Sequence, residues 1–197
     1  GKIAEQIGER AIEHGWESYI AYGRYASKSK SHLMRIGSRL GQAWHLILSR
    51  LLDRHGLGST WATKRLIKQI KKINPDVIHL HNLHGYYINY KLLFEYFNST
   101  DTPIVWTLHD CWSFTGHCAH FVEAGCHKWQ DRCDACPLLR QYPKSYYDRA
   151  KRNFDLKQQL FTTNKNLTLI PVSNWLAEFI PKSLHKQHKH TIIHNGI

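Results

Sequence analysis

The stretch IVWTLHDCWSFTGHC (residues 104–118) carries the strongest structural signal in this chain of 197 residues. Its first five residues are uncharged and mostly β-branched or aromatic, which is typical of a strand buried on both faces of a parallel sheet. His109 and Asp110 follow directly. Because open α/β sheets bind ligands beyond the carboxyl ends of their strands, we expect both residues to belong to a functional site.

Helical and extended patterns alternate along the rest of the chain. We expect helices over residues 3–12, 33–52, 60–73, 86–97, 146–163 and 174–180, and strands over residues 17–23, 77–81, 104–108, 167–172 and 191–193. Ser59 or Thr60 is the expected cap of the third helix. This alternation predicts an α/β fold with a doubly wound, mostly parallel, Rossmann-like sheet. We expect a single domain over residues 1–197 that lacks its first strand, with a Cys- and aromatic-rich irregular insertion over residues 111–145.

The chain is basic, with 27 Lys and Arg against 15 Asp and Glu. Between residues 24 and 74 there are twelve basic residues and one acid, Asp53. This segment predicts either an anionic partner, such as phosphate, nucleic acid or an acidic membrane surface, or a solvated helix face. No apolar stretch is long enough to span a membrane, and no secretory leader precedes the first helix. With five Cys, an odd number, the expected location is the reducing cytoplasm.

Four cysteines are clustered in the insertion, at Cys118, Cys126, Cys133 and Cys136. The last two form a C-x-x-C pair, so that a structural zinc site is one reading; disulfides and free thiols are the others. Cys111 is expected to be a small core residue.

A second group of candidates is His79, His81 and His84. Residues two apart on a strand share a face, so His79 and His81 could chelate a metal together with His109, as in a metal-dependent hydrolase. A basic nucleic-acid-binding module is a further alternative, although the basic residues are remote from the thiols. Trp112 and Phe114 are candidates for stacking on a sugar face or for the core, and Lys144 and Arg149 for binding a phosphate or for a solvated surface.

Several longer motifs resemble one known family. The segments IHLHNLHGYY (78–87) and TLHDCWSFTG (107–116), the four cysteines followed by Pro137, and the segments YPKS (142–145) and PVSNWL (171–176) are similar to the N-terminal domain of family-4 retaining glycosyltransferases. The likeness is greatest to the branch that acts in bacterial surface-polysaccharide synthesis, and it covers essentially the whole chain.

The resemblance implies one half of a two-domain GT-B enzyme that moves a sugar, with retention, from a nucleotide-sugar to a polysaccharide or lipid-linked saccharide. It implies that His109 contacts the transferred sugar and that His81, Asn82 and His84 line the acceptor side. Asp110 is expected either to bind an acceptor hydroxyl or to cap its loop.

The donor would bind mostly to a C-terminal domain outside this chain, and the fragment alone should be inactive. Catalysis would need no cofactor, because the leaving diphosphate helps to deprotonate the acceptor. We expect no nucleic-acid partner, and a cytoplasmic location with peripheral contact at the inner face of the membrane.

Overall fold

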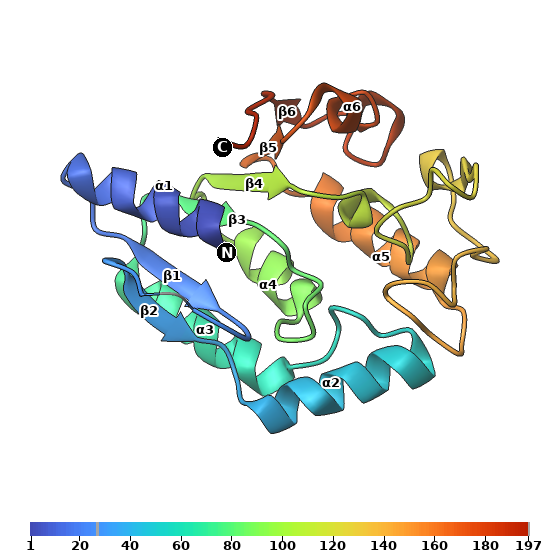
Figure 1. The fold of residues 1–197 in the computed structure, drawn as a ribbon, viewed down its shortest axis with the longest axis horizontal. Helices are drawn as coiled ribbons and strands as arrows, with labels where there is room; N and C mark the ends of the chain where they lie inside the picture. The colour runs from blue at the N-terminus through green and yellow to red at the C-terminus, as the bar shows by residue number, and fades with distance from the viewer. Residues whose placement is uncertain (27, 197) are drawn as a thin grey trace.

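The computed structural model describes residues 1–26 and 28–196 and confirms the α/β class (Figure 1). In these residues the strands form two parallel sheets. The smaller sheet pairs β1 (Tyr19–Tyr22) with β2 (His32–Arg35). The larger has the order β3 (Ile78–Leu80), β4 (Ile104–Leu108), β5 (Leu167–Pro171) and β6 (Lys189–His190).

Helices lie between the successive strands of the larger sheet, as is usual for parallel pairing, whereas β1 and β2 are joined without a helix in the described residues. The helices are α1 (Lys2–Glu13), α2 (Arg39–Leu52), α3 (Thr60–Ile73), α4 (Tyr90–Phe97), α5 (Ala150–Thr162) and the short α6 (Asn174–Ala177). Short 3-10 helices cover Trp112–Phe114, Lys128–Gln130 and Ile180–Lys182. The helix α4 packs between α3 and α5 (Figure 1). None of the described helices is both long enough and apolar enough to cross a membrane.

The core is built around β4, whose uncharged residues are almost all buried. Trp106 of β4 packs against Phe161 of α5, with ring centroids 5.2 Å apart, and Phe94 of α4 lies 4.4 Å from the same Phe161 ring. Aromatic pairs at these distances add to the free energy gained from burial alone. The aromatic side chains of α4 and α5 therefore fix the position of the strand that precedes His109.

One predicted helix is wrong in its first part. Residues 32–35 form β2, and α2 begins only at Arg39. The hydrophobic spacing runs on through Ile36, but Gly37 has a φ of +70° and breaks the chain between strand and helix. Ser38 then caps α2, its hydroxyl oxygen accepting the Gly41 N–H at 3.2 Å.

Other boundaries shift by a few residues. The helices predicted from Tyr86 and Tyr146 begin at Tyr90 and Ala150. The last strand lies at Lys189–His190 rather than 191–193, although the N–H groups of Thr191 and Ile193 still bond to carbonyls along β5. Ser59 sits at the start of α3 with a φ of 52° and makes no capping bond.

His45 on α2 is a buried histidine whose two ring nitrogens are both engaged. Its Nδ1 lies 2.9 Å from the Ser59 hydroxyl, and its Nε2 accepts the Gly58 N–H at 3.1 Å. Burial lowers the pKa of His45 to about 4. Because Nε2 is an acceptor here, a proton at this atom would break the bond to Gly58.

The free energy of unfolding should therefore fall as the pH falls. Between pH 6.5 and about 4 the unfolded chain binds a proton at His45 that the folded chain does not. We expect His45→Gln to make the pH dependence of the unfolding free energy shallower by about 1.4 kcal/mol per pH unit in this window. Urea denaturation at pH 7, 6, 5 and 4 measures this, and equal slopes in both proteins would contradict it.

Candidate functional site

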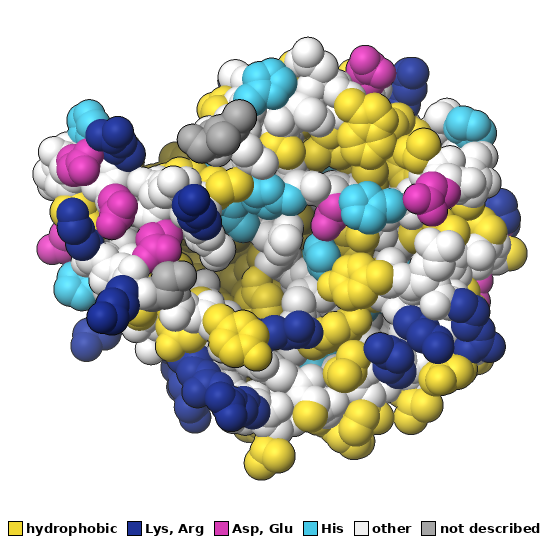
Figure 2. All heavy atoms as spheres, viewed as in Figure 1, with side chains coloured by type: hydrophobic (Ala, Val, Ile, Leu, Met, Phe, Trp, Pro, Cys, Tyr) yellow, Lys and Arg dark blue, Asp and Glu magenta, His cyan; other side chains and the backbone are white. Residues whose placement is uncertain are grey.

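The candidate site lies where β3 and β4 end side by side. Leu80 pairs with Trp106 in parallel register, so the residues that follow each strand meet at the carboxyl edge of the sheet. His81 Nδ1 lies 3.1 Å from His109 Nε2, and the two rings stack with centroids 5.4 Å apart. Figure 2 shows histidine side chains beside a hollow near the centre of this face. We call His81, His84, His109 and Asp110 the histidine edge.

Two histidines of this edge, His81 and His109, are electrically neutral at pH 7. Burial, together with the neighbouring His79 and His109, lowers the pKa of His81 to about 3. Burial also lowers the pKa of His109, and the Asp110 carboxylate offsets only part of that effect. One nitrogen of the His81–His109 pair therefore donates a hydrogen bond and the other accepts it. Both rings can hydrogen-bond a sugar hydroxyl without a charge.

Asp110 is held as an ionised carboxylate. Its Oδ2 lies 2.8 Å from His84 Nε2, and its Oδ1 accepts the Trp112 N–H at 2.9 Å. Burial by itself would raise the pKa of Asp110, but the hydrogen bond and charge of His84 outweigh it, and the pKa is lowered. The other nitrogen of His84 lies 2.9 Å from the Tyr142 hydroxyl. His84 thus orients Asp110, and Asn82 lies exposed at the rim beside His81.

His79 does not join a three-histidine metal site. Its Nε2 lies 2.7 Å from the Thr107 hydroxyl, within the sheet, and its ring stacks on His81. Among the described residues, the group of three or more possible ligands whose atoms all lie within 4.8 Å of one another is a different one, Asp53, His55 and His117. The geometry therefore gives no support to the hydrolase alternative.

The prediction that Trp112 and Phe114 bind sugar is wrong for this structure, because both side chains are buried in the core. The Trp112 indole donates to His55 Nδ1 at 2.8 Å, and the ammonium of Lys157 covers its ring at 3.5 Å from the centroid. Phe114 packs on Trp129 with centroids 5.4 Å apart. Neither ring has a free face on which a sugar could stack.

Lys144 and Arg149 lie apart from the histidine edge. Each cation sits over a tyrosine ring, Lys144 over Tyr146 at 5.7 Å and Arg149 over Tyr147 at 5.2 Å. Arg149 also lines an open pocket of about 640 Å³ with Lys151, Arg152 and two aspartates, and no residue of the histidine edge lines it. Their role in binding phosphate stays a prediction.

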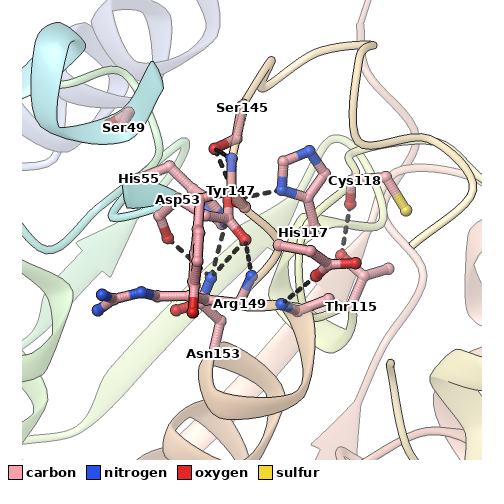
Figure 3. Close-up of polar contacts among 12 residues, drawn as sticks. Ser49, Asp53, His55, Thr115, His117, Cys118, Ser145, Tyr147, Arg149 and Asn153 are labelled. Carbon is pink, nitrogen blue, oxygen red and sulfur yellow. Dashed lines mark hydrogen bonds and ion pairs between the residues drawn. The ribbon is translucent and has the colours of Figure 1, made fainter. Parts of the chain in front are cut away.

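Figure 3 shows a buried polar network that sequence reasoning missed. The Asp53 carboxylate lies 2.6 Å from His117 Nδ1 and 3.5 Å from His55 Nε2, and it accepts the Arg149 N–H at 2.9 Å and the Asn153 side-chain amide at 3.2 Å. We call Asp53, His55, His117 and Asn153 the Asp53 network. The one available signal was that Asp53 is the single acid in a basic segment.

The four clustered cysteines also come together. Cys118, Cys126, Cys133 and Cys136 line one small pocket in the insertion, together with His117. All five thiols of the chain are free, and Cys111 is buried, as predicted. Cys118 is close enough to Cys136 to lower the pKa of the Cys136 thiol.

Comparisons with known proteins show the family of this chain. The family described as Glycosyltransferase Family 4 matches residues 2–197. A protein of Escherichia coli (strain K12) named "Putative colanic acid biosynthesis glycosyl transferase WcaC" is 32% identical over 209 residues, covering 99% of this chain and 50% of its own length. The chain thus spans about half the length of this relative, and no solved structure matches it. On the family match and this identity, the chain belongs to Glycosyltransferase Family 4.

Proposed function

We propose that this domain is the acceptor-side half of a retaining glycosyltransferase. The whole enzyme would move a sugar from a nucleotide-sugar to a polysaccharide or lipid-linked saccharide. The observation that carries the proposal is the histidine edge, in which neutral His81 and His109 and an ionised Asp110 stand together at the end of two parallel strands. Family membership supplies the reaction class, and the name of the Escherichia coli relative supports a surface polysaccharide as the product.

His109 would contact the sugar that is transferred. A neutral imidazole can accept a hydrogen bond from one sugar hydroxyl and keep its contact as positive charge develops at the anomeric carbon. A protonated imidazole would repel that charge. The burial that lowers the pKa of His109 therefore suits it to this position.

Asp110 would orient the acceptor. Its carboxylate can accept a hydrogen bond from the attacking hydroxyl, while the leaving diphosphate takes the proton on the same face of the sugar. Front-face substitution of this kind retains the anomeric configuration. His84 keeps Asp110 in place through the 2.8 Å bond, so that we assign His84 a positioning role.

The amino end of helix α1 would supply a partial positive charge near the donor diphosphate. In Figure 1 the first turn of α1 lies beside β3, and Gly1 is close to both His81 and His109. The amino end of a helix of this length favours a bound anion. Most contacts to the nucleotide would come from a second domain, which closes over the histidine edge.

Loss of the His109 ring should slow the reaction without unfolding the domain. In the intact enzyme we expect His109→Ala to lower kcat by about 100-fold or more, because one preorganised hydrogen-bonding group at the reacting centre is removed. His127→Ala, at an exposed histidine of the insertion, is the matched control and should keep wild-type activity. Unchanged turnover in His109→Ala, with the circular dichroism spectrum also unchanged, would reject the assigned role.

We propose in addition that α2 rests on an anionic membrane surface, where a lipid-linked acceptor would be found. Its apolar residues at helical spacing face outward, with Leu40 85% exposed, Trp44 61% and Leu51 56%. Figure 2 shows hydrophobic and basic side chains together along the lower edge, where α2 runs in Figure 1. Asp53, the one acid among residues 24–74, is buried, so the exposed charged side chains of this segment are all basic.

Replacing one exposed tryptophan should distinguish this contact from non-specific adsorption to vesicles. We expect Trp44→Ala to weaken binding to vesicles that contain phosphatidylglycerol by about tenfold, because an indole at a membrane interface contributes on the order of 1 kcal/mol. Trp175→Ala, a 44% exposed tryptophan on α6, is the matched control and should bind like the wild type. Equal affinities of all three proteins in vesicle co-sedimentation would contradict the proposal.

A further inference from the structure

We propose that the insertion holds one structural zinc ion, bound by the thiolates of Cys118, Cys126, Cys133 and Cys136. The four side chains come from separate turns of an irregular segment and line the same pocket, of about 10 Å³. That is roughly the room taken by one water-sized sphere. Tetrahedral sites of four cysteines are a standard form of structural zinc. This inference is independent of the proposed function.

The surroundings of the thiols favour a metal over free thiols. The pocket is enclosed by Phe121 and Trp129, with centroids 4.9 Å apart and stacked rings. No three of the four sulfurs lie within 4.8 Å of one another in the described structure, so coordination would draw them together across the pocket. Each thiol would lose its proton to solvent, with no change of oxidation state.

His117 supplies a second, independent observation. Its side chain is fully buried, and it lines the same pocket as the thiols. Nδ1 is held by the Asp53 carboxylate at 2.6 Å, while Nε2 has no hydrogen-bond partner among the described residues. A buried ring nitrogen without a partner costs free energy unless something at the site satisfies it. With Nδ1–H donated to Asp53, Nε2 carries a lone pair without a partner, and a metal ion or a hydrogen-bond donor in the pocket that His117 lines would satisfy it.

Lys157 is the third observation. Its ammonium is fully buried and donates to the carbonyls of Trp112 and Thr115, at 2.6 and 2.9 Å, yet no carboxylate among the described residues lies within ion-pair distance. Burial lowers the pKa of Lys157 to about 7, so its ammonium form is only marginally stable at neutral pH without a counter-charge. A zinc ion with four thiolates carries two negative charges, and the thiols of Cys133 and Cys118 are near enough to act on Lys157. The centre would thus supply the missing counter-charge.

The Asp53 network is not itself the metal site, although its three ligand atoms lie close together. The Asp53 carboxylate already accepts bonds from His117, from the Arg149 N–H and from Asn153. His55 Nδ1 accepts the Trp112 indole N–H. With these bonds in place, the lone pairs that Asp53 and His55 would offer to a metal are occupied.

The test is the metal content of the intact protein, purified without chelator from cells grown with zinc. Elemental analysis should find about one zinc per chain, and the Cys133→Ser/Cys136→Ser variant should have lost it. Cys111→Ser removes a buried thiol outside the pocket and should keep the full metal content. Less than a tenth of an equivalent of metal in the wild type, or the same content in the double variant, would overturn the proposal.

A second measurement covers the case in which the double variant fails to fold. Zinc in the wild type is exchanged for Co²⁺, and thiolate ligation should give intense sulfur-to-cobalt charge-transfer absorption in the near ultraviolet. Stripping the metal with a chelator should lower the melting temperature by about 10 °C or more. Absence of the charge-transfer band, or an intact mass that reveals a disulfide within the insertion, would contradict a zinc–thiolate centre.

Discussion

The rest of the structure depends on a buried carboxylate and the hydrogen bonds that lead from it to the surface. Asp53 closes α2 with a φ of 48° and lies beside His55, which accepts the Trp112 indole N–H. The Trp112 backbone N–H bonds to Asp110, and Asp110 bonds to His84. Five residues from distant parts of the chain thus form one path from the core to the histidine edge. Unpaired, the Asp53 charge would be too costly to bury.

This arrangement separates two kinds of polar group. The histidines at the end of the sheet are kept neutral by burial, whereas Asp110 is kept ionised by the hydrogen bond from His84. A neutral donor–acceptor ring beside a fixed carboxylate is suited to binding sugar hydroxyls in defined directions. The basic, apolar outer face of α2 lies on another part of the surface, so that the proposed sugar site and the proposed membrane contact need not compete.

How far the sequence predicts this structure depends on whether the signal is local. β4 was predicted to the residue because its uncharged run is bounded by polar residues, and the meeting of His81 with His109 followed from parallel pairing. Predictions from local patterns failed where the same residue fits two different structural roles. Ile36 continued a helical spacing across the Gly37 break, and Trp112 has the chemistry of either a sugar platform or a core residue.

The Asp53 network could not be predicted, because its members lie 64 and 100 positions apart in the chain and share no periodicity. The burial of Lys157 could not be predicted either, because the helical pattern of α5 alone predicts an exposed side chain at this position. Contacts of this kind depend on how the insertion folds back against α5. A single sequence does not predict such long-range packing.

The most direct test is a crystal structure of the intact enzyme with a non-hydrolysable nucleotide-sugar bound. The account predicts that a hydroxyl of the donor sugar lies at about 3 Å from a ring nitrogen of His109, with Asp110 facing the acceptor side of the anomeric carbon. A sugar bound away from His81, His109 and Asp110, for example over the pocket lined by Arg149, would contradict it.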